Sequence, residues 1–210
     1  MKNMGLPVVG TDLVVAVTGG MGAGKSSVAR FLCTISGATG FDADAVCRGL
    51  LAPEAPGWLA LRGAFGEKFF LADQTVDRPL LRETLFADQG FRENVNALLH
   101  PLVRRQLWAQ IRELAENSPG SRVVVEVPLL YEAGWQADYS RVVVVYADAA
   151  VCRKRLMLRD MSGVLEAEQA MGAQLSLADK VLLADHVIDN SGAWEDTCLQ
   201  VHRLSAILWP

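Results

Sequence analysis

The amino-acid sequence predicts an α/β fold built on a doubly wound parallel sheet. Short, continuous apolar runs recur along the chain, as expected for strands that are buried on both faces. Helical stretches separate these runs, which implies parallel strands joined by right-handed crossovers. Hydrophobic residues make up 51% of the 210 residues, which is enough for one well-buried core and a small appended lobe.

Five strands are expected, and the first is the clearest. Residues 13–17 form a short β-branched run that ends at glycines, and helical sequence follows from 25 to about 34. The second strand is expected to end at Phe41, just before Asp42-Ala43-Asp44. The remaining strands are expected at 123–127, 141–146 and 184–188.

A helical insertion is expected between the second and third strands. About 80 residues separate these strands and carry no strong strand signal. Helices are predicted at 78–87, 91–99 and 101–115, and an insertion of this size suits a substrate lobe. A shorter helical excursion, at about 149–183, separates the fourth and fifth strands.

Composition limits the partners and the compartment. The net charge of −4 gives no basic field, so nucleic-acid binding is not expected as the main activity. The four cysteines form no CxxC pair and are expected to be reduced thiols of a cytoplasmic protein. The apolar run at 13–17 is too short for a signal peptide or a membrane span, and residues 1–12 are expected to be a leader. We expect a monomer or a small homo-oligomer.

The segment from Gly19 to Ser26 matches the phosphate-loop pattern GxxxxGK[ST] in full and lies between a predicted strand and a predicted helix. Its glycines let the backbone approach phosphates, and the helix N-terminus favours the anion. We expect Lys25 to bridge the β- and γ-phosphates of a nucleoside triphosphate and Ser26 to ligate Mg²⁺, with Ser27 near the α-phosphate. The other residues expected to bind the nucleotide are Gly20, Gly22, Ala23 and Gly24.

The segment Asp42-Ala43-Asp44 is a candidate source of a catalytic base. A small-molecule kinase needs a base near the acceptor hydroxyl, and ligands of open α/β sheets bind at the carboxyl ends of the strands. Two carboxylates at i and i+2 of an extended segment would point the same way. Alternatively, both could be acids that cap a helix N-terminus.

Arg155 and Arg159 lie four residues apart on a predicted helix and hence on one face. Such a pair suits the charge that develops on a transferred phosphoryl group, although a solvated basic face would look the same. Glu126 lies inside an apolar strand, where it could contact water on Mg²⁺ or be buried and hydrogen-bonded. His100 alone would more often be a structural residue than a ligand.

The order of these motifs resembles the dephospho-CoA kinase family over about 14–192. A phosphate loop alone is common to many families, whereas this ordered series is specific. The series runs Thr18 to Ser26, Phe41-Asp42-Ala43-Asp44 with Arg48, Phe65-Gly66, Asp77-Arg78 with Leu81, Phe86, Asn96, His100-Pro101, Pro128-Leu129-Leu130-Tyr131-Glu132, Arg155 with Arg159, Gln174, Lys180, Ala184-Asp185 and Val187 to Gly192.

The resemblance implies a P-loop kinase that transfers the γ-phosphoryl group of ATP, with Mg²⁺, to the ribose 3′-hydroxyl of dephospho-CoA, the last step of CoA synthesis. It implies a nucleoside-monophosphate-kinase-like fold with a five-stranded parallel core, a helical CoA-binding lobe and a lid. The core would cover about 13–47, 120–148 and 184–210. The lobe would cover about 48–119 and the lid about 149–183, all within one unit at 13–210.

The resemblance also assigns roles in the reaction. Asp44 matches the catalytic base, and Arg48 would contact the acceptor near its reacting end. Lys25 and the lid arginine, Arg155, would stabilise the transferred phosphoryl group, with Arg159 in support.

Further residues would bind the two substrates. Asn190 would approach the adenine of ATP, and Arg78 and His100 would hold the acceptor. The chain departs from the family at Ala170-Met171-Gly172, where the lid usually carries an arginine. That departure leaves more of the lid's charge to the two arginines of the preceding helix.

Two other readings stay open from the residues. One is a different small-molecule or nucleotide kinase on the same core. The other is a regulatory P-loop NTPase, although the chain has no Asn-Lys-x-Asp tetrapeptide for base recognition.

Overall fold

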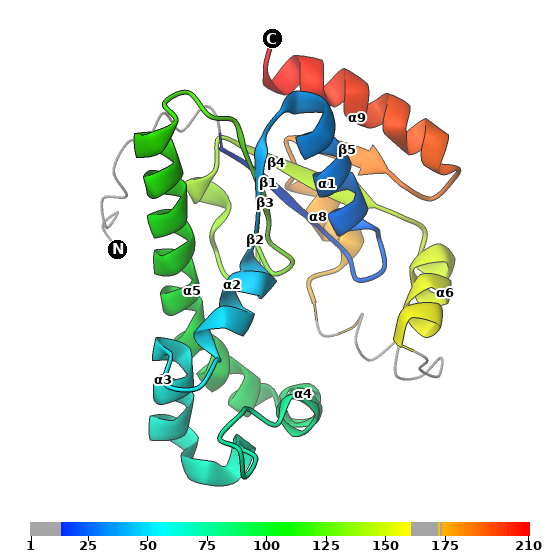
Figure 1. Ribbon diagram of the computed structural model, residues 1–210. Coiled ribbons are helices and arrows are strands. Elements are labelled where there is room, and N and C mark those ends of the chain that lie inside the picture. The colour runs from blue at the N-terminus through cyan, green and yellow to red at the C-terminus, as the bar shows by residue number, and fades with distance from the viewer. Residues whose placement is uncertain (1–13, 161–171, 173) are drawn as a thin grey trace.

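The computed structural model describes residues 14–160, 172 and 174–210. Its centre is a five-stranded sheet in the order β2-β3-β1-β4-β5 (Figure 1). The strands are β1 (Val14–Gly19), β2 (Thr39–Asp42), β3 (Val123–Glu126), β4 (Arg141–Tyr146) and β5 (His186–Asp189). All four neighbouring pairs are parallel. The predicted α/β fold with a parallel sheet of five strands is confirmed.

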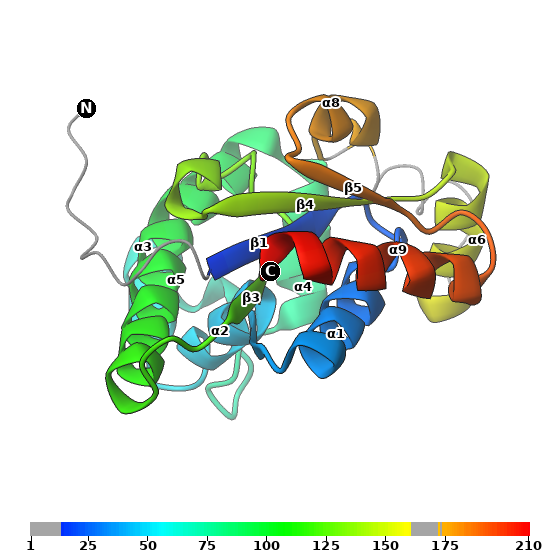
Figure 2. The ribbon, with the colours of Figure 1, turned by 90° about the horizontal axis from the view of Figure 1, so that it is seen from above.

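Helices cover both faces of the sheet, because its three central strands are apolar on both sides. Helices α1 (Lys25–Ser36) and α9 (Trp194–Leu208) lie on one face, and α8 (Leu177–Leu182) lies on the other (Figure 2). Successive residues of β1 alternate between the two faces. Val15 and Val17 pack with α1 and α9, whereas Val14 and Ala16 pack with the C-terminal part of α5 (Gln89–Asn117).

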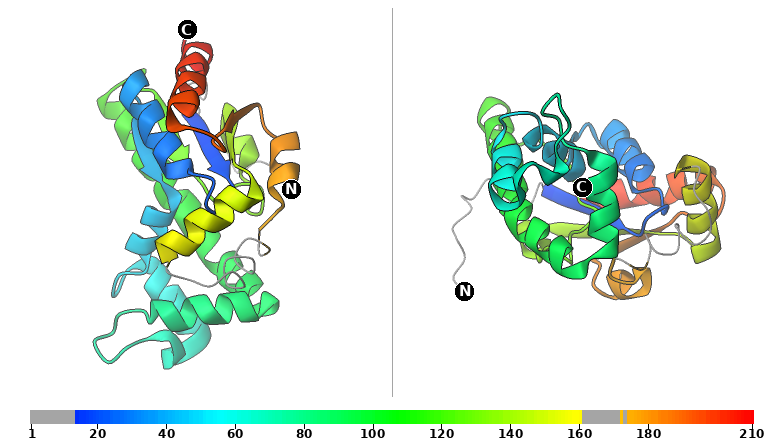
Figure 3. Two further views of the ribbon diagram at one scale, coloured as in Figure 1. Left: turned by 90° about the vertical axis from the view of Figure 1, so that its right-hand side faces the viewer. Right: turned by 90° about the horizontal axis from the view of Figure 1, so that it is seen from below.

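A helical lobe projects from the sheet on a core of its own. It contains α3 (Pro56–Phe65), the 3₁₀ turn η2 (Gly66–Phe69), α4 (Arg78–Ala87) and the first half of α5 (Figures 1 and 3). Its buried residues are Trp58, Leu61, Phe69, Val76, Leu81, Val95 and Leu99. Helix α2 (Ala43–Leu50) joins this lobe to the end of β2. A helical lobe is therefore present between β2 and β3 as expected, whereas α5 from Val103 onward, which the predicted range 48–119 includes, packs against the sheet.

Helix α5 corrects the prediction of two helices at 91–99 and 101–115. It is one helix, with Pro101 inside it. Proline removes only one helical hydrogen bond, and the apolar face continues past it in steps of four residues, which keeps both halves on buried positions. The residues of that face are Val95, Leu99, Val103, Leu107 and Ile111. This continuity makes α5 the rigid link between the lobe and the sheet.

The remaining bounds differ from expectation by a few residues at most. The predicted helix at 78–87 and strand at 141–146 are found as predicted, whereas β5 begins at His186 instead of at 184. The excursion between β4 and β5 begins with α6 (Ala149–Asp160) and ends with α8. The predicted leader and the lid departure at 170–171 lie outside the described residues. No described helix combines the length and the hydropathy of a membrane span.

Candidate active site

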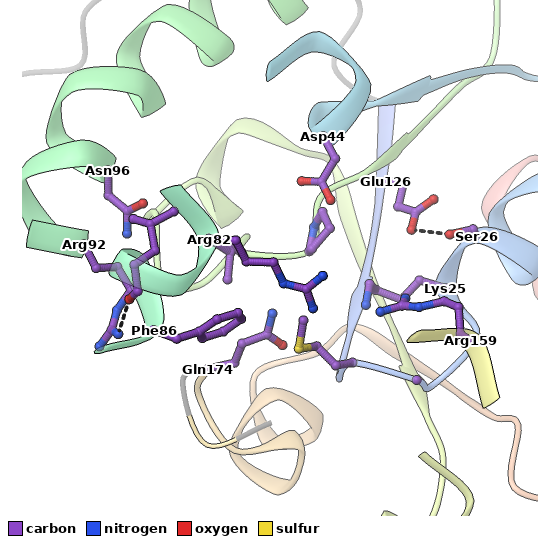
Figure 4. A pocket seen from close by; sticks show the side chains of 15 residues that line it. Lys25, Ser26, Asp44, Arg82, Phe86, Arg92, Asn96, Glu126, Arg159 and Gln174 are labelled. Atoms are coloured by element: carbon purple, nitrogen blue, oxygen red, sulfur yellow. Dashed lines mark hydrogen bonds between the residues drawn. The ribbon is translucent and has the colours of Figure 1, made fainter. Parts of the chain in front are cut away.

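A cavity of about 350 Å³ lies between the carboxyl ends of the central strands and the helical lobe (Figure 4). One wall is the phosphate loop with the start of α1, and the opposite wall is α4 with the first turns of α5. We call them the donor wall and the acceptor wall. The lining residues are Met21, Gly22, Lys25, Ser26, Asp44, Arg82, Leu85, Phe86, Arg92, Asn96, Glu126, Pro128, Leu129, Arg159 and Gln174.

The phosphate loop is held tightly against the chain behind it. Gly22 has a φ of +74°, and a Cβ there would lie 2.5 Å from the carbonyl oxygen of Cys152. Gly24 has a φ of +93°, and a Cβ there would collide with the side-chain amide of Asn190. These positions therefore require glycine on two grounds, a left-handed backbone and a close approach.

Asn190 and Arg155 fix the loop from behind. The buried side-chain amide of Asn190 donates to the carbonyl oxygen of Ala23 at 2.8 Å and accepts from the hydroxyl of Thr197 at 3.0 Å. The guanidinium of Arg155 donates to the carbonyl oxygen of Asn190 at 3.0 Å and reaches that of Ala23 at 3.5 Å. Both residues thus contact the loop backbone, and neither lines the cavity. Their predicted contacts with adenine and with the phosphoryl group stay predictions.

Lys25 and Ser26 open the first turn of α1 and line the cavity, whereas Ser27 faces solvent. The ammonium of Lys25 donates to the carbonyl oxygen of Gly20 at 2.9 Å, so it lies across the loop. The hydroxyl of Ser26 donates to Glu126 Oε1 at 2.7 Å. A hydroxyl and a carboxylate this close are hard oxygen donors of the kind that Mg²⁺ prefers.

The Asp42-Ala43-Asp44 segment corrects the prediction of two parallel carboxylates on an extended strand. Asp42 is the N-cap of α2 and accepts the backbone N–H of Asp44 at 2.8 Å, while Asp44 lies in the first helical turn. The alternative of a capping acid is therefore right for Asp42, which also pairs with Arg48 at 3.1 Å. The cap and Arg48 hold the carboxylate of Asp42, and only Asp44 of the two lines the cavity.

The acceptor wall consists mostly of residues that the sequence did not single out as candidate site residues. Arg82 lies with its guanidinium 5.6 Å from the ring centroid of Phe86, and Arg92 donates to the carbonyl oxygen of Leu85 at 3.0 Å. Asn96 completes this wall (Figure 4). Phe86 and Asn96 were part of the family pattern, but no spacing rule marks Arg82 or Arg92. Only the docking of α4 against α5 brings them together.

The predicted acceptor contacts Arg48, Arg78 and His100 are not among the described residues that line this cavity. Arg48 is bound to Asp42. His100 packs edge-on against Trp135 at 5.6 Å between ring centroids, and its burial lowers the pKa of the imidazole while Glu132 raises it. Contact of these three residues with an acceptor stays a prediction.

Burial dominates the electrostatics of the cavity. It lowers the pKa of Lys25, which Glu126 and Asp44 oppose and Arg159 reinforces. It raises the pKa of Glu126, against the Ser26 hydrogen bond and the charge of Lys25. Partial burial also raises the pKa of Asp44, to which Asp42 adds, while Arg48 and Lys25 pull it down. A carboxyl whose pKa is raised is a better proton acceptor once it is ionised.

Known proteins match this chain over most of its length. A family model described as dephospho-CoA kinase matches residues 13–196. A dephospho-CoA kinase of Symbiobacterium thermophilum is 38% identical over 189 residues, covering 90% of this chain and 78% of the relative. Another, of Geobacter metallireducens, is 40% identical over 192 residues, covering 91% of this chain and 94% of the relative.

A crystal structure of a protein from Thermus thermophilus superposes with a TM-score of 0.80 at 26% identity. The match covers 94% of this chain and 98% of that one. Together these matches confirm the family resemblance and the fold class that the sequence predicted.

Proposed function

The chain belongs to the dephospho-CoA kinase family, and on that premise we propose how its cavity performs the reaction. Membership makes it a kinase that uses ATP to phosphorylate dephospho-CoA in the final step of CoA biosynthesis. Family membership also decides against the two alternatives that the sequence left open, a different small-molecule or nucleotide kinase and a regulatory P-loop NTPase. The observation that carries the proposal is that Asp44 opens into the same cavity as Lys25 and faces the acceptor wall.

We assign the binding of the triphosphate to the donor wall. The backbone N–H groups of the loop and the N-terminus of α1 would bind the phosphates, and Lys25 would turn from the Gly20 carbonyl to the β- and γ-phosphates. Arg159 lines the cavity beside Lys25 and would stabilise charge on the transferred group. Arg155 would support the nucleotide side through its hold on the loop backbone.

We assign the ribose of the acceptor to the space between Asp44 and the acceptor wall. The carboxylate of Asp44 would accept the proton of the 3′-hydroxyl as its oxygen attacks the γ-phosphorus in line. Phe86 would pack against an apolar or aromatic part of dephospho-CoA, and Arg82 and Arg92 would face its phosphates.

Mg²⁺ fits the donor set at the start of α1. Ser26 would bind the ion, and Glu126, hydrogen-bonded to that hydroxyl, would hold water in its coordination shell. When bound, the ion would offset the negative charge of the β- and γ-phosphates. No group of three or more His, Cys, Asp or Glu side chains in the described part of the chain could form a closed metal cage.

The test is release of ADP from ATP and Mg²⁺, measured with and without dephospho-CoA. The wild-type chain should release ADP at a rate that depends on the acceptor. Asp44→Asn should lower kcat by about two to four orders of magnitude, the usual scale for loss of a general base, while ATP affinity measured by calorimetry stays nearly unchanged. Wild-type turnover in Asp44→Asn would refute the assignment of the base.

Asp42→Asn is the matched control. Asparagine caps a helix about as well as aspartate, so α2 and Asp44 should stay in place and kcat should stay within about tenfold of wild type. Equal losses in the two variants would assign the effect to the segment as a whole instead of to Asp44.

A further inference from the structure

We propose that the ion pair between the fully buried Lys180 and Glu132, whose side chain is 21% exposed, positions one side of the transfer cavity, and that this pair sets the productive placement of the acceptor. The inference rests on the kinase activity proposed above and adds two positioning residues to it. Neither residue lines the cavity among the described residues. Both act through the neighbours that they hold.

Lys180 is the only lysine of α8, and its side chain is fully removed from solvent. Its ammonium lies 2.9 Å from Glu132 Oε1 and donates to the carbonyl oxygen of Pro128 at 3.2 Å. The same Glu132 oxygen accepts the backbone N–H of Leu175 at 2.9 Å. One oxygen and one ammonium therefore join two stretches of chain that are about 40 residues apart in sequence.

Each stretch carries residues of the cavity. Pro128 and its neighbour Leu129 line the cavity after β3, and Gln174, which precedes Leu175, lines it from the side of α8. The carbonyl oxygen of Pro128 also lies 3.4 Å from the hydroxyl of Thr18, at the end of β1 and next to the phosphate loop. The pair thus joins the Pro128 side of the cavity to the Gln174 side, and the Thr18 contact attaches the Pro128 side to the end of β1.

The charges matter because of where they lie. An ion pair with a buried ammonium need not stabilise a fold more than apolar side chains of the same volume, since desolvation of the ammonium offsets the attraction. What the pair supplies here is a fixed geometry, because the ammonium of Lys180 can donate to Glu132 Oε1 and to the carbonyl oxygen of Pro128 at once. Lys180 is also close enough to Lys25 to lower the pKa of that ammonium. Loss of this ion pair should therefore change the kinetic constants for the acceptor even where the free energy of unfolding changes little.

The experiment compares Lys180→Met, Glu132→Gln and the double variant by steady-state kinetics with both substrates varied. Because small displacements of reacting groups are costly, Lys180→Met should raise the KM for dephospho-CoA and lower kcat, each by about tenfold. The KM for ATP should stay within about twofold, because the loop is held separately by Asn190 and Arg155. The share of ADP released without CoA formed should rise as well.

Glu132→Gln keeps an acceptor for the N–H of Leu175 but removes the charge opposite Lys180. It should raise the acceptor KM by about threefold or more, and it tests the proposal even where Lys180→Met gives no folded protein. The double variant should lose less than the product of the two single losses, because the two residues act through one contact. If the fold-loss of the double variant equalled the product of the two single fold-losses, the two residues would act independently and the proposed pairing would be wrong.

Two exposed residues give matched controls, Lys68→Met and Glu116→Gln, which should leave all constants within about twofold. A merely structural pair would lower the melting temperature and the active fraction while leaving the acceptor KM and the coupling of ADP release to CoA formation at wild-type values. That result would overturn the proposal. Absence of acceptor-dependent ADP release in the wild-type chain would instead count against the proposed function.

Discussion

The two walls of the cavity are built in different ways. The donor wall is one continuous segment, from the end of β1 into α1, whose geometry is fixed by glycines and by contacts with Asn190 and Arg155. The acceptor wall is assembled from two helices of a lobe that has its own small core. Its lining side chains come from α4 and α5, and several of them are partly or fully exposed.

This difference follows from what each wall has to bind. Every nucleoside triphosphate presents the same phosphates, so a local backbone shape can serve as the whole binding element. An acceptor differs from one kinase to the next and is bound by side chains on an insertion. The donor wall can therefore be predicted from a short sequence motif, whereas the residues of the acceptor wall come together only through the packing of α4 against α5.

A matched pair of core leucines tests whether the two walls are independent. Leu61 lies in the lobe core and Leu32 lies in α1 behind the phosphate loop, and both are fully buried. Either change to alanine should lower the free energy of unfolding by about 2–5 kcal/mol. Leu61→Ala should mainly raise the acceptor KM and Leu32→Ala should mainly weaken ATP binding, as measured by kinetics below the melting temperature. Identical kinetic effects would show that the walls respond as one unit.

Gly24→Ala should break the donor wall alone. The added methyl group has to collide with Asn190 while the backbone is held at a φ of +93°. We expect kcat/KM for ATP to fall by about 100-fold or more. The control is Gly37→Ala, which has a φ of +69° but no atom within 4 Å of the added Cβ. It should cost stability without changing the KM for ATP, and equal kinetic losses in both variants would contradict the role of the Asn190 contact.

Phe86→Ala should weaken the acceptor wall alone. The ring lines the cavity and is 39% exposed, so it is available to a ligand. Its loss should raise the KM for dephospho-CoA by about five- to tenfold and leave the KM for ATP unchanged. Leu59→Ala removes an exposed apolar residue of the lobe, 55% exposed, that does not line the cavity and should have no such effect. An unchanged acceptor KM in Phe86→Ala would remove the ring from the site.

The smallest expected effect is in the pH dependence of activity and stability, which depends on Asp44, the carboxyl placed between the two walls. The pKa of Asp44 is raised above 3.8, so the ionised base is lost at a higher pH than for an ordinary aspartate. Activity should fall on the acid side through that raised pKa. A carboxyl with a raised pKa favours the fold below its unfolded pKa and loses that contribution as pH rises, so wild type should lose stability relative to Asp44→Asn over the same range. Thermal melting against pH checks the sign.

Much of the fold could be predicted from the sequence. The three central strands were predicted to within a few residues because each is a short apolar run, and the predicted helix at 78–87 is present and begins at its Asp77 cap. The prediction of two helices separated at Pro101 was wrong, because it relied on the proline alone and ignored the apolar face that continues past it. The extended reading of Asp42 and Asp44 was wrong for a similar reason, since a capping hydrogen bond reoriented the pair.

The sequence by itself determined the donor site, because the spacing of Gly19, Gly24, Lys25 and Ser26 specifies a backbone shape through local geometry. It also determined the family, through the order of its motifs. The family pattern pointed to Asp44, but only the tertiary structure decided which arginine faces the cavity and which residues form the acceptor wall. Those outcomes depend on contacts between segments far apart in the chain, such as Arg155 with the phosphate loop and Lys180 with Glu132. Side-chain direction at such contacts is set by packing, which no local spacing encodes.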